Sequence, residues 1–400
     1  MARRPPGGGL LGGGPTMPDG TMLQRHLPFL ADMPAEAQEA VRKAAAMRDA
    51  SAIERRDQRA RRLDAAAETA RRAMADTLGA ETGRALRALL RAEALSWRAL
   101  LQPPAGLAAD FNETNAARRR RAEAFLRQSG VDVEKLRSIG MEFQTAVAAE
   151  PDAAGPTTPG FHLQGNLAAW LDLSPLHDAA LPWGVTLKPD PNDPHRWEVF
   201  RPPFFGFDFG FLSSHNSNFT VDREHVLSPP AGLVGLVCTM EDPDAGDFDS
   251  AAVDARSQVA FGFTPPVAGL VEVLIDAQST IGTHDLRTGD EWGWSNSTTR
   301  QTNFLMVDVL HPNVPEPSFA EMSAFLHKTD DDDTVHRETL IRGQHYFARL
   351  FSSGPVPAGQ SVVITAGTRS FDESGTNDVS IRSRSQFEWF ISSIEVRIAP

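Results

Sequence analysis

The stretch RPPFFGFDFGF (Arg201–Phe211) carries the strongest local pattern in the chain. Side chains along a β-strand alternate between its two faces, which places one set of residues together: Phe205, Phe207, Phe209 and Phe211. The other face carries Gly206, Asp208 and Gly210. Burying each phenylalanine is worth about 1.5 to 3 kcal/mol, so the pattern predicts a core strand rather than a binding surface. The glycine positions leave the opposite backbone open to the approach of another segment.

The composition is that of an ordinary globular protein. Of the 400 residues, 41% are hydrophobic and 23% are charged, which predicts two or three domains with a large core. The single cysteine, Cys238, lies in the apolar run LVGLVC, so it forms no internal disulfide and we expect a buried thiol.

The N-terminus carries two arginines followed by PPGGGLLGGGP, without the continuous apolar segment of a secretory signal peptide. No apolar run approaches the roughly 18 residues of a membrane-spanning helix. We therefore expect no transmembrane segment, and a protein that is cytoplasmic or released by a non-classical route.

The net charge of −13 hides an asymmetry between the two parts of the chain. Residues 1–150 hold 24 basic and 19 acidic groups, whereas residues 151–400 hold 15 and 33. The acidic part excludes nucleic acid as an expected partner, because phosphate contacts need clustered Lys and Arg. The run Arg118–Arg121 would spread around a helix, which favours a solvated basic turn.

We predict a flexible Gly/Pro-rich tail over residues 1–22 and a helical region over residues 33–150. A long helix begins near Pro34 and ends before Gly79, with an apolar stripe in its second half: Leu63, Ala67, Ala70, Met74 and Leu78. A second helix is expected around Leu86–Leu101, a third after Asp110 and a fourth after Asp132. Stripes of this kind are typical of a helical hairpin, a bundle or an intermolecular coiled coil.

Residues 160–400 consist of short alternating runs separated by Pro, Gly, Asp and Asn, which predicts an antiparallel β-sandwich of jelly-roll type. Two segments repeat the order strand, Pro-containing turn, Ala-Gly, strand: 259–275 and 348–365. They indicate two related halves, over about 160–315 and 316–400. The fold class is thus α+β, a helical region followed by a sandwich. The repeated unit, about a tenth of the chain, is similar to turns in non-catalytic sandwich modules such as carbohydrate-binding modules.

The segment DEWGWSN is the best candidate for a ligand site. Trp292 and Trp294 would share one strand face, beside Asp290, Glu291 and Asn296. Stacking rings with neighbouring hydrogen-bonding groups are typical of sugar sites, although two tryptophans at this spacing also suit a sandwich core.

Metal-binding and catalytic signals are weak. The loop EDPDAGDFD brings together four carboxylates that could hold calcium, although their spacing departs from the EF-hand pattern: Asp242, Asp244, Asp247 and Asp249. We otherwise expect no cofactor. The histidines His215, His225, His336 and His345 form no short-spaced pair, and we interpret each as a surface or core residue. None of the common catalytic motifs occurs, so an enzyme is not expected.

Three functional hypotheses follow. The first is a non-enzymatic structural or assembly protein, in which the helices mediate self-association or docking and the sandwich forms the contact surface. The second is a β-sandwich module that binds carbohydrate or another ligand, including a protein partner. The third and weakest is a pore-forming toxin.

Overall fold

The structure is a computed structural model of the whole chain. It describes residues 20–86, 111–149, 161–164, 193–195, 197–216, 218–243, 248–290, 296–311, 318–329, 333–377 and 379–399. The loop that carries Trp292 and Trp294 and most of the second expected helix therefore lie outside the described residues.

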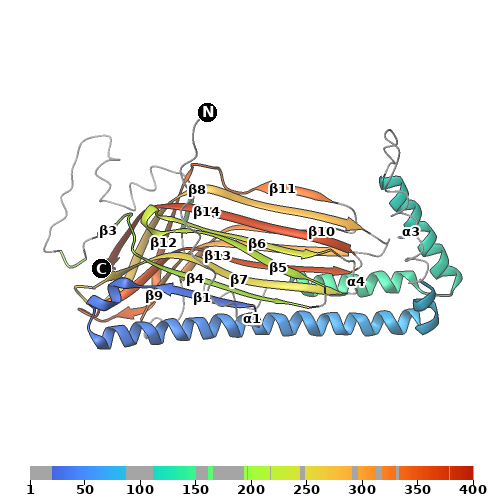
Figure 1. The fold of residues 1–400 in the computed structure, drawn as a ribbon, viewed down its shortest axis with the longest axis horizontal. Helices are drawn as coiled ribbons and strands as arrows, with labels where there is room; N and C mark the ends of the chain where they lie inside the picture. The colour runs from blue at the N-terminus through green and yellow to red at the C-terminus, as the bar shows by residue number, and fades with distance from the viewer. Residues whose placement is uncertain are drawn as a thin grey trace.

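Helix α1 (Ala35–Leu78) has 44 residues and runs along the whole length of the molecule (Figure 1). It follows Pro34 and ends at Gly79, whose positive φ of 70° is a backbone conformation that glycine adopts far more readily than residues with a Cβ. Helix α3 (Phe111–Gln128) rises at one end, and α4 (Val133–Ala148) lies beside α1. The carboxylate of Asp132 caps α4 by accepting from the Lys135 backbone N–H, as expected. The predicted first, third and fourth helices are confirmed.

Two antiparallel sheets form the rest of the described chain. The first has six strands in the order β1-β4-β7-β13-β9-β10: β1 (Thr21–His26), β4 (Gly206–His215), β7 (Asp249–Phe263), β13 (Val362–Asn377), β9 (Asn296–Leu310) and β10 (Ser318–Thr329). The second has eight strands, six of them in the order β2-β12-β8-β14-β6-β5: β2 (Phe161–Gln164), β12 (His345–Val356), β8 (Gly269–Asp290), β14 (Val379–Ile398), β6 (Leu233–Asp242) and β5 (Thr220–Ser228). At its margins β11 (Thr334–Glu338) pairs with β8, and β3 (Glu198–Phe200) pairs with β14. Short 3-10 helices occupy Pro28–Asp32 and Pro229–Ala231.

The two sheets pack face to face around an apolar core. Its largest cluster joins side chains such as Val259 and Leu305 of the six-stranded sheet to Phe387 and Trp389 of the eight-stranded sheet. Cys238 lies in a neighbouring cluster as a buried free thiol, as expected. The predicted fold class, a helical region followed by an antiparallel β-sandwich, is confirmed.

Both repeated segments form the predicted strand, turn and strand, and each turn carries the chain from one sheet to the other. The first connects β7 to β8 and the second connects β12 to β13. The turns lie side by side, because the backbone N–H of Gly359 donates to the Pro265 carbonyl at 2.7 Å. Strands from the ranges 160–315 and 316–400 are interleaved in both sheets, with β13 between β7 and β9 and β14 between β8 and β6.

The stretch that opened the sequence analysis is strand β4, and its prediction holds only in part. Phe209 and Phe211 are buried and Phe207 is half-buried, but Phe205 is 69% exposed. The strand begins at Gly206, one residue after Phe205, so the sheet does not hold that ring against the core. The expected approach of another segment to the glycine face is confirmed, because a Cβ on Gly206 would meet the Phe29 ring.

Strand β1 has no counterpart in the sequence prediction. It pairs with β4 from Thr21 to His26, and its partner lies almost 190 residues further along the chain. Six residues are too few for an alternating pattern to mark a strand, and the sequence does not show that β4 is available as a pairing partner.

Candidate functional site

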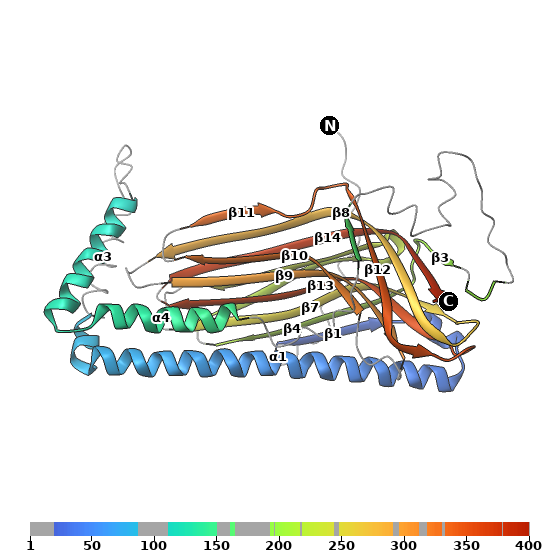
Figure 2. The same ribbon diagram turned by 180° about the vertical axis from the view of Figure 1, so that it is seen from behind.

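The outer faces of the two sheets differ in what covers them. Helices α1 and α4 lie against the outer face of the six-stranded sheet (Figure 2). The N-terminal third of α1 packs through Val41, Ala44 and Ala45 on Ala260 and Val363 of the sheet. Its C-terminal third packs on α3, α4 and β7 through the stripe that contains Leu63, Ala67, Ala70 and Met74. That stripe is therefore occupied inside the chain; self-association through the helices stays a prediction that the structure does not test.

The middle of α1 contacts the sheet through charged side chains, which we call the buried charge layer: Arg48, Arg59, Asp208, Asp254, Arg256, Asp308, Arg369 and Glu373. Arg48 forms ion pairs with Asp208 of β4 and Asp308 of β9. Arg256 of β7 adds a bond to Asp208 at 3.4 Å. Burial alone would raise the pKa of Asp208, but the guanidinium groups of Arg256 and Arg48 outweigh it and hold this pKa well below its ordinary value.

The second half of the buried charge layer is centred on Phe371 of β13. The guanidinium groups of Arg59 and Arg369 lie over its ring at 4.3 and 4.2 Å. Arg369 also binds Asp254 with two parallel hydrogen bonds of 3.0 and 2.8 Å, and Arg62 donates to Glu373 at 3.1 Å. The charges on this face are thus matched among themselves beneath the helix.

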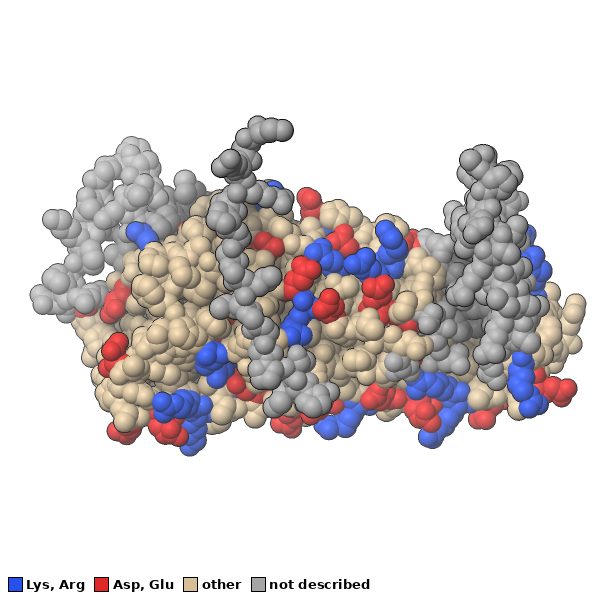
Figure 3. All heavy atoms as spheres, in the orientation of Figure 1, with Lys and Arg blue, Asp and Glu red and all other residues tan. Residues whose placement is uncertain are grey.

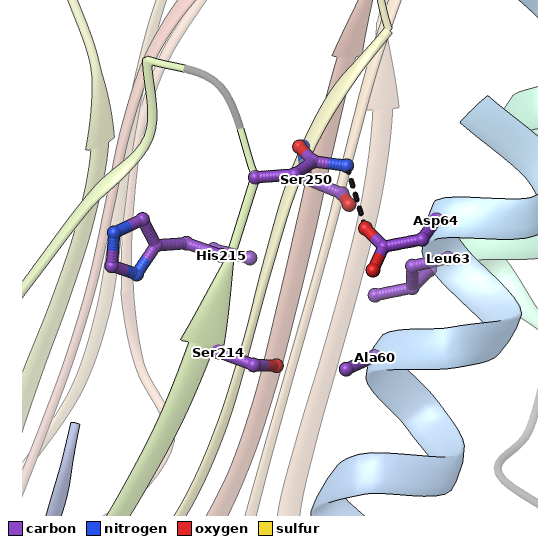
Figure 4. A pocket seen from close by; sticks show the side chains of 8 residues that line it. Ala60, Leu63, Asp64, Ser214, His215 and Ser250 are labelled. Atoms are coloured by element: carbon purple, nitrogen blue, oxygen red, sulfur yellow. Dashed lines mark hydrogen bonds between the residues drawn. The ribbon is translucent and has the colours of Figure 1, made fainter. Parts of the chain in front are cut away.

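A small cavity of about 30 Å³ lies where α1 crosses the ends of β4 and β7 (Figure 4). Asn216 donates to Asp64 at 3.0 Å and accepts from the Ser250 backbone N–H at 2.6 Å. His215 points away from the helix on the other side of the strand (Figure 4). The volume suits one water molecule, so we regard this cavity as part of the seam between helix and sheet rather than as a ligand site.

The outer face of the eight-stranded sheet carries a hollow of about 360 Å³ across β11, β8 and β14. We call it the basic groove, and its outward-facing residues are Asp285, Arg287, Thr334, His336, Arg382 and Arg384. Figure 3 shows this face, with Lys and Arg side chains gathered over these strands and acidic ones between them. A hollow of this volume is within the range of small-molecule sites.

The strand register arranges these residues in two rows. In the first row, Thr334, Arg287 and Arg382 are direct neighbours on adjacent strands. In the second row, Asp285 lies between His336 and Arg384. Asp285 is 2.5 Å from His336 Nδ1 and 3.8 Å from Arg384, so one carboxylate faces an imidazole and a guanidinium group.

The titration of His336 is perturbed by its neighbours in the groove. Its hydrogen bond to Asp285, together with the charge of that carboxylate, raises its pKa above the ordinary value; Glu338 acts in the same direction from 3.7 Å. A histidine with a raised pKa adds positive charge to the groove as the pH falls.

The structure places few of the site residues that the sequence predicted. Glu291, Trp292 and Trp294 lie outside the described residues, and of Asp290 only the backbone, at the end of β8, is described. Asn296 begins β9 and accepts at its carbonyl from the Gln144 side chain of α4 at 3.1 Å. The predicted aromatic site therefore stays a prediction, three residues beyond Arg287 in sequence.

The predicted acidic loop connects β6 to β7. Asp242 is buried and accepts from the Thr376 hydroxyl at 3.0 Å, while Asp249 is buried with the Arg71 guanidinium 3.6 Å away. Asp244 and Asp247 lie outside the described residues, so the calcium site stays a prediction. Within the described part of the chain, no group of His, Cys, Asp and Glu side chains is arranged to hold a metal ion.

Sequence reasoning missed the three groove arginines and assigned no role to His336. The alternating run IRSRSQ and the triplet DLR contain the signal, because they place Arg382, Arg384, Asp285 and Arg287 on outward-facing positions. What the sequence does not reveal is that these two segments, about 100 residues apart, pair in register.

No protein-family model matches the chain, and no curated protein matches it. Part of it is similar to the enzymatically active domain of tailspike protein 4 from bacteriophage CBA120, at 9% identity and a TM-score of 0.10, over 45% of this chain and 18% of that one. It is also similar to the module TmCBM61 in complex with β-1,4-galactotriose, at 11% identity and a TM-score of 0.10, over 43% of this chain and 86% of that one. A third similar structure is a family 11 carbohydrate-binding module of a Clostridium thermocellum cellulase, at 7% identity and a TM-score of 0.11, over 40% of this chain and 86% of that one. With TM-scores this low, none of these likenesses bears on function.

Among the described residues, no helix is long and apolar enough to cross a membrane.

Proposed function

We propose that this chain is a non-enzymatic ligand-binding β-sandwich whose site is the outer face of the eight-stranded sheet. One observation carries the proposal: helices cover the outer face of one sheet, while the other holds the hollow of about 360 Å³ that exposes charged and polar side chains. A hollow on which a few polar groups converge is the default candidate for a binding site in a structure.

The ligand that this site supports best is a carbohydrate. Sugars present hydroxyl groups that both donate and accept, and the groove offers both kinds of partner. Asp285 supplies acceptor oxygens, and Arg287 and Arg382 supply donors. The loop with Trp292 and Trp294 follows directly after β8, the strand that carries Asp285 and Arg287, and could add the stacking rings predicted from the sequence.

The proposal is tested by saturation-transfer NMR of the full chain against a panel of neutral and acidic oligosaccharides. Thr334→Trp would fill the groove and should abolish the signal from any ligand that binds there. Thr69→Trp, at an exposed position of α1, is the matched control and should leave binding unchanged. If no oligosaccharide binds, or if both variants bind like the original chain, the groove is not the site.

Two further measurements complete the test. The double variant Trp292→Ala/Trp294→Ala should weaken binding at unchanged stability; a large loss of stability would instead identify the two rings as core residues. Chromatography of the bound oligosaccharide after prolonged incubation should return it unaltered, and cleavage would show that the chain is an enzyme.

A further inference from the structure

We infer that the basic groove recognises an acidic sugar, one that carries a carboxylate or a sulfate group, as part of an oligosaccharide. The inference rests on the proposed function and names its ligand class. It depends on three features of the groove: two arginines in register, one carboxylate between cationic groups, and acidic residues along its border.

The first feature is a repulsion within the fold. Arg287 and Arg382 are direct register partners on β8 and β14, and like charges in this arrangement destabilise a sheet. Arg382 has Glu241 at 3.7 Å on its other side, whereas no ion pair joins Arg287 to a carboxylate of the described residues. An anionic group bound between the two guanidinium groups would offset this repulsion.

The chemistry of arginine narrows the kind of anion. A guanidinium group presents parallel N–H donors that match the two oxygens of a carboxylate, and likewise the oxygens of a sulfate. Two adjacent arginines that share no carboxylate among the described residues therefore form a receptor for one oxyanion. Arg382 is 57% exposed, so a ligand can reach it from solvent.

The second feature is the acceptor beside these donors. Asp285 accepts a hydrogen bond from His336 and forms an ion pair with Arg384 at 3.8 Å, and these contacts hold its carboxylate at the centre of the groove. Its oxygens can accept further hydrogen bonds, and the exposed hydroxyl of Thr334 can donate or accept. A ligand that satisfies all of these groups needs an acid group and hydroxyl groups a few ångströms apart, as an acidic sugar has.

The third feature argues against a nucleic acid or an anionic membrane. The first row continues from Arg382 to Glu241 on β6, and the border strands expose Asp222, Glu224 and Glu338. A polyphosphate backbone or an anionic bilayer presents continuous negative charge, which these carboxylates and the net charge of −13 repel. A short acidic oligosaccharide, in which hydroxyl groups separate a few acid groups, meets less of this repulsion.

Isothermal titration calorimetry of the full chain tests the inference with three matched probes: trigalacturonate, its neutral methyl ester and a sulfated trisaccharide. We expect trigalacturonate or the sulfated trisaccharide to bind, and the methyl ester to bind at least tenfold more weakly. Whichever acid binds more tightly identifies the acid group. Affinity should fall as salt is added, because the charged contacts are exposed.

The variants Arg287→Gln and Arg382→Gln should each weaken acid binding at least tenfold. Arg42→Gln on α1, which removes a similarly exposed arginine, should not change it. None of the three variants should unfold at a lower temperature than the original chain, and the two groove variants, which remove the repulsion between Arg287 and Arg382, should unfold at the same or a slightly higher temperature. Any loss of binding is then local.

The outcomes separate this inference from the proposed function. If the methyl ester binds as tightly as the acid, and Thr334→Trp abolishes both, the groove binds sugars but the acidic class is wrong. If no oligosaccharide binds, both proposals fail. Binding of duplex DNA or of vesicles with anionic lipid, lost in Arg287→Gln and Arg382→Gln, would also overturn the acidic sugar as the ligand.

Discussion

The two outer faces of the sandwich carry the same charged residue types, arginine and aspartate, but in different surroundings. On the six-stranded sheet, arginines of α1 meet aspartates of the strands beneath a helix, and nearly all of these groups are buried. On the eight-stranded sheet, arginines and one aspartate line a hollow that is open to solvent. Buried charges that form ion pairs hold helix α1 on its sheet, whereas exposed charges that are only partly paired are available to a ligand.

The largest expected effect on the free energy of unfolding comes from removing one charge of the buried ion pairs beneath α1. Arg48→Met removes the cation between Asp208 and Asp308 and leaves two buried carboxylates with less compensation. Breaking a buried pair in this way costs about 3 to 5 kcal/mol, which urea unfolding should report as a lower free energy of unfolding. Arg42→Met, six residues earlier on the exposed side of α1, is the control and should cost less than about 1 kcal/mol.

The apolar end of the covered face gives the next effect. Leu63→Ala leaves a cavity between α1, α4 and β7, and we expect a loss of about 2 to 5 kcal/mol. Because this leucine packs inside the chain, light scattering should give the same solution mass for the variant and the original. A change from oligomer to monomer would show that the stripe also packs between chains.

A pair of buried aspartates sharpens the comparison of matched with unmatched charge. Asp208 has arginines around it, whereas Asp372, equally buried between the sheets, accepts from the hydroxyls of Ser370 and Ser385 at 2.8 and 2.7 Å and forms no ion pair with an arginine of the described residues. Burial raises the pKa of Asp372 to about 6. A raised pKa in the folded state means that its contribution to stability is full below about pH 4 and is lost as the pH rises through about 6.

Asp372→Asn should therefore stabilise the protein above pH 6, by up to about 3 kcal/mol, and should make little difference below pH 4. Urea unfolding of both forms between pH 4 and 8 measures this difference. An equal offset at every pH would mean that the carboxyl does not titrate in this range.

The smallest effect belongs to the open face. Arg384 is 30% exposed and lies 3.8 Å from Asp285, so Arg384→Met should lower the free energy of unfolding by less than about 1 kcal/mol. A loss as large as that of Arg48→Met would mean that this face serves stability as the covered face does. The contrast between the two substitutions thus tests the assignment of the two faces.

The sequence predicts local features of this fold well, because their signals lie within a few residues. Pro34 and Gly79 mark the ends of α1, Asp132 marks the start of α4, and the Pro-containing turns mark the crossings from β7 to β8 and from β12 to β13. The start of β4 is not predicted correctly, because the alternating pattern includes Phe205 whereas the strand begins at Gly206. Strand pairing, not periodicity, decides that boundary.

The candidate site could not be predicted for the same reason. Arg287 and Arg382 are neighbours only through the register of β8 with β14. The arginines of α1 are likewise ordinary surface residues by composition, and only the aspartates of β4 and β9 explain why Arg48 is buried. An aromatic pair is easier to recognise in a sequence than charges that meet across strands.

The most direct test of the central claim is the titration of His336 by NMR of protein with ¹³C-labelled histidine, with the signal assigned by His336→Gln. In the free protein its pKa should lie above about 6.5, because Asp285 and Glu338 face it, although Arg384 and Arg287 lie nearby. Saturating trigalacturonate, or the sulfated trisaccharide, should raise this pKa further, since the bound anion stabilises the imidazolium, while the signal of His215, at the end of β4 in the other sheet, stays unchanged. If the ligand saturates the protein and His336 keeps both its pKa and its chemical shift, the basic groove is not where the ligand binds.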